Sequence, residues 1–187
     1  IKNTGNTSLR FASPNSFDAG KLRFLQNTIN LDFSRPLELF EKANISFGLE
    51  QRHEAYSTVA GEELSYATYD IHGGVLPLGA PSSQKTTDFF GNALPGGAQM
   101  LPGFRKESAL TKTRNVVAGY GEFETDITKW LLANAAVRYE HYSDFGNTFN
   151  YKLATRVKLF PNVNLRGAAS TGFRAPSIHQ LYYTNIN

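Results

Sequence analysis

The sequence predicts an all-β fold of antiparallel, up-and-down strands joined by long loops, and three observations support this prediction. Polar and apolar residues alternate with a period of two over several stretches, as in strands that have one apolar face. Aromatic residues make up 13% of the 187 residues, and such side chains fit a pleated sheet better than a helix. Turn residues separate the alternating stretches, so we expect about six strands.

The candidate strands are long for a globular protein. They cover residues 25–35, 44–56, 113–125, 130–142, 149–160 and 165–175. Strands in globular proteins usually have about 5 to 6 residues, whereas a tilted strand needs about 9 to 11 residues to cross a bilayer. Short connections, such as 126–129 and 161–164, alternate with longer ones. Outer-membrane barrels show this asymmetry, so the pattern favours part of a transmembrane barrel with its long loops outside.

Charged residues fall on the polar side of these strands. In a soluble sandwich this side faces water, whereas in a large barrel it lines a polar lumen where opposite charges compensate one another across strands. The alternation alone leaves both interpretations open. The candidates for a lumen-facing position are Glu50, Arg52, Glu122, Arg138, Glu140, Arg156, Arg166 and Arg174.

A long segment without alternation, residues 57–110, separates the second and third candidate strands. Loops longer than about 12 to 15 residues are uncommon in compact domains and are usually functional or disordered. This segment is rich in glycine and proline and also carries aromatic side chains, which a rigid scaffold can use to bind a ligand. The same side chains could equally pack the loop against its neighbours. The ligand-binding candidates are Tyr66, Tyr69, Phe89, Phe90 and Phe104.

Several function classes find no support in the sequence. The net charge is only +3, with 19 basic and 16 acidic residues spread along the chain, so we expect no nucleic-acid partner. There is no cysteine, and none of the four histidines has a second ligand at a convincing spacing, so we expect no metal site. No nucleophile motif such as GxSxG is present, and we expect no catalytic residue, no cofactor and no enzymatic activity.

Two late segments carry a family resemblance: RYEHYSDFG at residues 138–146 and GFRAPSIHQLY at 172–182. They resemble the C-terminal barrel region of TonB-dependent outer-membrane receptors, and the motif Gly172, Phe173, Arg174, Ala175 and Pro176 resembles a recurrent strand end of that family. The resemblance implies a barrel of 22 antiparallel strands closed around an N-terminal plug. Residues 1–187 would then be a fragment of the barrel domain, because six strands cannot close such a barrel. Neither a plug nor a TonB-contacting segment is recognisable in these residues.

The resemblance also implies a function. Such receptors lie in the outer membrane as multi-pass barrels in contact with its lipid, and they import a scarce nutrient, such as an iron–siderophore, a cobalamin or an oligosaccharide. The implied partners are this small-molecule or oligosaccharide ligand, the plug domain of the same parent chain, and the TonB complex, which contacts the parent's N-terminal segment. The residues leave two alternatives open: a soluble β-sandwich that acts as a binding or adhesion module, and a passive porin.

Overall fold

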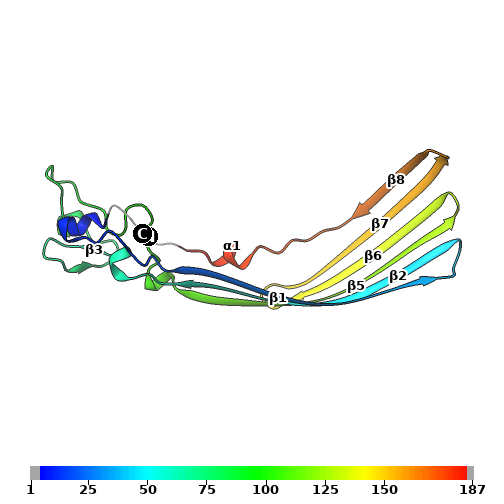
Figure 1. The fold of residues 1–187 in the computed structure, drawn as a ribbon, viewed down its shortest axis with the longest axis horizontal. Coiled ribbons are helices and arrows are strands. Elements are labelled where there is room, and N and C mark those ends of the chain that lie inside the picture. The colour runs from blue at the N-terminus through cyan, green and yellow to red at the C-terminus, as the bar shows by residue number, and fades with distance from the viewer. Residues whose placement is uncertain (1–4, 185–187) are drawn as a thin grey trace. The chain divides into compact units, whose positions relative to one another are not determined.

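The computed structural model describes residues 5–184, and its main feature is one six-stranded sheet. Neighbours in the sheet follow the order β1-β2-β5-β6-β7-β8, so that consecutive long strands lie side by side (Figure 1). The long strands are β1 (Lys21–Leu37), β2 (Lys42–Val59), β5 (Leu110–Thr128), β6 (Leu131–Tyr142), β7 (Gly146–Phe160) and β8 (Val163–Ser170). Each expected strand corresponds to one of them, and the all-β fold class is confirmed. The first four and last three residues of the expected 1–187 fragment lie outside the described residues.

The register of β5 to β8 decides which side chains share a face. Arg138 on β6 lies opposite Tyr120 on β5 and Asn150 on β7, and Arg156 on β7 lies opposite Arg166 on β8. All three pairings are antiparallel. Because successive side chains point to opposite faces, even-numbered residues of these four strands form one face and odd-numbered residues the other. The even face carries most of the charges, and we call it the polar face.

The odd face is apolar and exposed. Leu49 is 60% exposed, Phe149 is 62% exposed, and the rings of Phe33 and Phe47 stack on each other with 5.2 Å between their centres. In a soluble β-sandwich such a face would be buried between two sheets. The long strands within residues 5–184 form a single sheet, so the described part of the chain lacks the second large sheet that this alternative requires.

The chain divides into two compact units, which we describe separately. One unit comprises residues 25–54 and 113–178 and contains most of the long sheet. The other comprises residues 1–24, 55–112 and 179–187. In this second unit, Tyr66, Ala67 and Tyr69 form a small buried core against Leu9 and Leu64.

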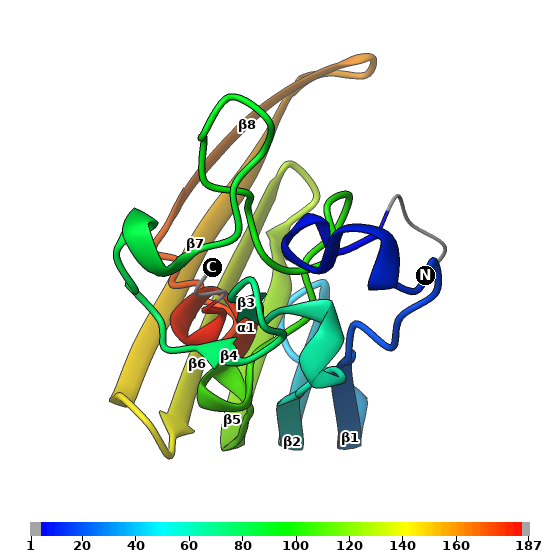
Figure 2. The ribbon, with the colours of Figure 1, turned by 90° about the vertical axis from the view of Figure 1, so that its left-hand side faces the viewer.

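The segment between Val59 and Leu110 is folded. It contains the short sheet of β3 (Thr68–Tyr69) and β4 (Val75–Leu76) and the 3-10 helices η2 (Glu63–Ser65), η3 (Ser82–Gln84) and η4 (Lys106–Ser108) (Figure 2). Another 3-10 helix, η1 (Thr7–Ala12), precedes the sheet. The fully buried Asn6 donates hydrogen bonds to the carbonyls of Leu64 and Ala67 at 3.0 and 2.9 Å. The backbone amides of Ala98 and Gly103 both donate to the carbonyl of Ser65 at 2.9 Å. These bonds connect the end of the segment to its beginning.

The last strand is shorter than expected. The alternation predicts a strand over 165–175, but β8 ends at Ser170, and a short helix, α1 (Ile178–Tyr182), follows. At the end of the strand, Thr171 still donates its amide to the carbonyl of Tyr151 at 2.9 Å. It accepts the Tyr151 amide with its hydroxyl at 3.0 Å instead of its carbonyl, and the regular ladder ends here. The placement of Arg174 on a strand face with Arg166 is therefore wrong, and Pro176 lies beyond the point where pairing ends.

Candidate functional site

A ladder of ion pairs crosses the polar face. Arg138 Nη2 lies 2.8 Å from Glu50 Oε2 and 2.9 Å from Glu140 Oε1, which links β2 to β6. On β2 itself, Arg52 contacts Glu54 at 3.2 Å and Glu50 at 3.8 Å. Four of the expected lumen-facing residues, namely Glu50, Arg52, Arg138 and Glu140, therefore belong to one network in which opposite charges compensate one another.

The ladder ends at Arg114 on β5, whose side chain is only 2% exposed. Its Nε and Nη2 donate to Asp144 Oδ2 at 2.8 and 2.6 Å, and its Nη1 lies 3.6 Å from Glu54 Oε2. The guanidinium also lies 5.4 Å from the centre of the Phe145 ring. A buried cation is tolerated when it is paired and hydrogen-bonded in this way.

Arg114 also holds the segment that carries the family motif. Its Nη1 donates to the carbonyl of Pro176 at 2.9 Å. Three residues earlier, the Phe173 ring packs against Phe145 and Tyr142, with ring centres 5.4 and 6.2 Å apart. In this unit, the motif is therefore an irregular segment that is fixed to the ends of β5 and β6. Gly172 and Arg174 are exposed, and Arg174 has no ion pair within the described residues.

The remaining charged candidates surround a hollow of about 520 Å³ on the polar face. Glu122 and Glu124 on β5 accept hydrogen bonds from the amide of Asn134 at 2.6 and 3.3 Å. Arg156 Nη2 lies 3.4 Å from Asp126 Oδ1, whereas Arg166 is exposed and has no ion pair among residues 5–184. We call this space the polar hollow, and Glu122, Glu124, Lys152, Arg156 and Arg166 are its charged lining residues.

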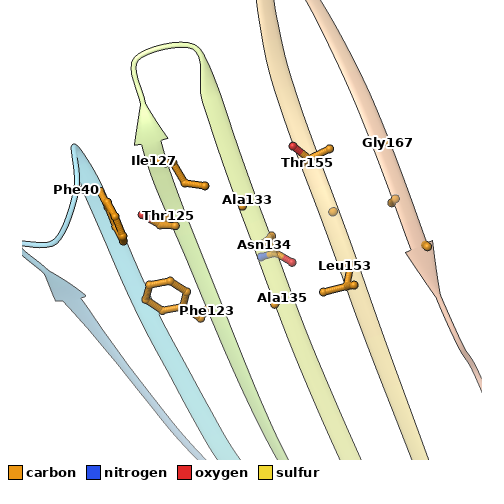
Figure 3. Close-up of a pocket in the computed structure, with 13 residues that line it drawn as sticks. Phe40, Phe123, Thr125, Ile127, Ala133, Asn134, Ala135, Leu153, Thr155 and Gly167 are labelled. Atoms are coloured by element: carbon orange, nitrogen blue, oxygen red, sulfur yellow. The ribbon is translucent and has the colours of Figure 1, made fainter.

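A second hollow, of about 670 Å³, lies mainly along the apolar face (Figure 3). The larger side chains of Phe40, Phe123 and Ile127 stand beside the small residues Ala133 and Ala135, which leaves a shallow space across β5 to β8. In the same view the amide nitrogen of Asn134 is turned toward β5 and its oxygen toward β7. This second hollow has no charged lining residue.

The five aromatic candidates of the long loop differ in how far their side chains are buried. Tyr66 and Tyr69 are buried in the small core, and Phe104 is half-buried, with its ring 6.2 Å from that of Tyr183. In contrast, Phe89 and Phe90 are 96% and 84% exposed and form an edge-to-face pair at 5.5 Å. Of the five, only this pair offers largely free aromatic surface.

Two turns of the long loop have the same architecture. In residues 70–74 and 88–92, the leading aspartate accepts hydrogen bonds from the backbone amides two and four positions later, at 2.7 to 2.9 Å. A glycine with positive φ, Gly73 at 80° and Gly91 at 85°, occupies the fourth position of each turn. Each turn presents exposed apolar side chains at its tip, Ile71 in one and the Phe89–Phe90 pair in the other. We call them the twin turns.

The bases of the twin turns are joined. Thr86, which is 2% exposed, donates its hydroxyl to the carbonyl of Tyr69 at 3.1 Å. Burial raises the pKa of the Tyr69 phenol, so this ring stays neutral. The backbone amide of Gly74 lowers the pKa of the Asp70 carboxyl, and the side chain of Asn92 does the same for Asp88. Both carboxylates are therefore charged when they hold their turns.

Among the described residues, no group of three or more His, Cys, Asp and Glu side chains could hold a metal ion. No helix within residues 5–184 is long and apolar enough to span a bilayer.

Sequence reasoning missed the central position of Arg114. Its partners come from β2, from the turn after β6 and from the segment after β8, and a period-two pattern cannot show such contacts. One signal was present, because Asp144 and Phe145 lie in the recognised segment 138–146 and Pro176 in the segment 172–182. The twin turns were also missed, although both have aspartate followed three residues later by glycine.

The sheet thus has a charged, internally paired face and an exposed apolar face, which is the arrangement of a transmembrane β-barrel wall. The family model for the TonB dependent receptor-like β-barrel matches residues 2–187. The chain therefore belongs to the TonB-dependent receptor β-barrel family, a family of outer-membrane barrels that serve as receptors in transport. No match was found among curated proteins or among solved structures.

Proposed function

We propose that this chain forms part of the wall and the extracellular mouth of a receptor that actively imports a scarce nutrient. The ligand would be an iron–siderophore, a cobalamin or an oligosaccharide. The observation that supports this proposal best is the pair of faces on one sheet, with the polar side toward a lumen and the apolar side toward outer-membrane lipid. The barrel would cross the membrane many times and would bind and transport without catalysis.

In this proposal, ligand recognition rests on the twin turns. The Phe89–Phe90 pair is exposed and held in place by its turn, so it can stack on a ligand at a low entropic cost. Tyr66 and Tyr69 support the loop from its core. A plug domain of the parent chain would fill the lumen, and the TonB complex would act on that plug.

The test is uptake by a strain that lacks the full-length receptor, compared with the same strain carrying it. We expect the receptor to restore uptake of one nutrient from a panel of iron chelates, cobalamins and oligosaccharides, and a protonophore to abolish this uptake. Uptake that persists with the protonophore would instead support the passive porin. A receptor that fails to fractionate with the outer membrane would contradict both.

A further inference from the structure

The apolar, odd face of the sheet ends in polar side chains on the side of the long loop. On β6, the odd-numbered residues run from Leu131 through Tyr139 to His141. At a rise of about 3.4 Å per residue and a strand tilt of about 40°, His141 lies about 26 Å from Leu131 along the barrel axis. The apolar band of an outer-membrane barrel is about 25 Å tall. His141 therefore marks the outer limit of this band.

Two histidine–asparagine pairs occupy this limit. His141 Nδ1 lies 2.6 Å from Asn147 Oδ1 across the β6–β7 pair. His53 Nδ1 on β2 lies 2.7 Å from Asn115 Oδ1 on β5. Val117 on β5 stands opposite His141, and Asn115 comes two residues closer to the long loop, so the second pair is one row further out. We call these four residues the polar row.

Each pair offers both a hydrogen-bond donor and an acceptor to its surroundings. The asparagine oxygen only accepts, so the histidine Nδ1 carries the hydrogen of the bond. This leaves the Nε2 lone pair of the neutral ring as an acceptor and the asparagine NH2 group as a donor. If the amide is turned round, the two roles are exchanged and the pair still offers one of each. Hydroxyl groups, which also donate and accept, match such a pair.

The polar row contains no lysine, arginine or carboxylate. Among the odd-numbered strand residues of the sheet unit, Arg35 is the one with a formal charge, and it lies near the opposite end of β1. Phosphate groups are typically bound by arginine or lysine, because charge-assisted hydrogen bonds are stronger than neutral ones. The polar row therefore fits a neutral, hydroxyl-rich partner better than an anionic one.

Two aromatic side chains border the polar row on the membrane side. Tyr139 and Phe149 stand opposite each other, one row from His141 and Asn147, and are 49% and 62% exposed. Aromatic residues at a membrane interface have one part in lipid and another near water. The C–H face of a sugar ring can pack on these rings while its hydroxyl groups reach the polar row.

We propose that the polar row, together with Tyr139 and Phe149, binds the sugar headgroup of a glycolipid in the outer leaflet of the membrane. The asparagine amides donate to hydroxyl oxygens, and the histidine Nε2 atoms accept from hydroxyl groups. The acyl chains of the same lipid continue along the apolar face, which is the lipid-facing side of an outer-membrane barrel. This surface lies outside the barrel, so it is separate from the plug and from the path of the imported nutrient.

The first experiment maps where a glycolipid contacts the full-length receptor in nanodiscs. The bilayer is phosphatidylcholine with a small fraction of digalactosyl diacylglycerol that carries a photoreactive group on its sugar, and mass spectrometry locates the adducts. We expect adducts at residues 113–117 and 139–149 that unlabelled digalactosyl diacylglycerol removes by competition and phosphatidylglycerol does not. Equal competition by both lipids would indicate general headgroup contact and overturn the proposal. A lack of adducts at these residues would also overturn it, because another surface would then cover the polar row.

The second experiment compares glycolipid affinity between matched variants. Native mass spectrometry measures how much digalactosyl diacylglycerol the receptor retains over a series of glycolipid fractions. Asn147→Ala removes one amide of the polar row and should weaken retention by about two- to tenfold, the equivalent of about one neutral hydrogen bond. Asn150→Ala is the control, because Asn150 lies on the polar face of the same strand, opposite Arg138. Unchanged retention in Asn147→Ala, or equal losses in both variants, would overturn the proposal.

Discussion

At the scale of single residues, Arg114 joins more parts of the sheet unit than any other side chain described above. It contacts β2 through Glu54, the β6–β7 turn through Asp144 and the motif segment through Pro176. Its guanidinium is buried and is held by two carboxylates and a carbonyl. A substitution that removes the positive charge therefore destabilises the fold, because it leaves the carboxylates without a compensating cation.

We predict that Arg114→Gln lowers the free energy of unfolding of the receptor by about 3 kcal/mol, as for other broken buried ion pairs. The measurement is the urea midpoint in detergent, read from tyrosine fluorescence. Arg174→Gln is the control, because Arg174 is exposed and unpaired in the described residues, and its change should be below about 0.5 kcal/mol. Equal midpoints for the two variants would contradict the role assigned to Arg114.

The aspartates of the twin turns predict a pH dependence that is local to the loop. Each has a pKa below its ordinary value of 3.8 in the folded loop, so the ionised form contributes stability above pH 3.8. That contribution is lost as the pH falls from 3.8 through the lowered pKa. We expect the amides of Phe90 and Asn92 to lose protection from hydrogen exchange over this range, after correction for intrinsic rates.

Asp88→Asn separates this effect from general acid unfolding. An asparagine oxygen can still accept the amides of the turn, but it does not titrate in this range. Protection at Phe90 and Asn92 should therefore stay constant in the variant while the Asp70 turn still responds to pH. If both turns respond in the variant as in the parent protein, their carboxylates do not control the loop.

At the scale of elements, the twin turns depend on glycine at one position. Gly91 has a φ of 85°, and a Cβ added there would meet no atom within 4 Å. An alanine at this position would therefore be disfavoured only by the left-handed backbone that it has to adopt. We predict that Gly91→Ala costs about 1 kcal/mol through this strain alone. Gly172→Ala is the matched control, because it also has nothing within 4 Å and has no such φ. Proteolytic nicking of the loop should increase for Gly91→Ala alone, and equal nicking of both variants would exclude backbone strain as the cause.

The six long strands could be predicted from the sequence because each alternates clearly, with apolar residues such as Leu49 and Phe149 on one face. The end of β8 could not be predicted, because Phe173 continues the apolar alternation beyond Ser170, where the regular pairing of β7 and β8 ends. Likewise, composition alone could not separate Tyr66 from Phe89, since both are aromatic residues in a glycine-rich loop. Their difference in burial depends on contacts with Leu9 and Leu64, and Leu9 lies far away in sequence.

At the scale of the whole molecule, the exposed apolar face predicts dependence on a lipid-like environment. We expect the chain to sediment as large aggregates in detergent-free buffer and to become monodisperse when detergent covers residues such as Leu49 and Phe149. Unpaired edges at β1 and β8 in the described sheet add to this tendency. Analytical ultracentrifugation at several detergent concentrations tests this, and a stable monomer without detergent would contradict a lipid-facing surface.

The twin turns also have a consequence for natural variation. Their hydrogen bonds involve the aspartate side chain, the backbone and, in the second turn, the side chain of Asn92. None of them uses the side chains of Ile71, Phe89 or Phe90. Mutations at these three positions are therefore expected to leave the loop folded. A receptor built in this way can change which molecules its loop tips contact, one residue at a time, while its barrel sequence stays the same.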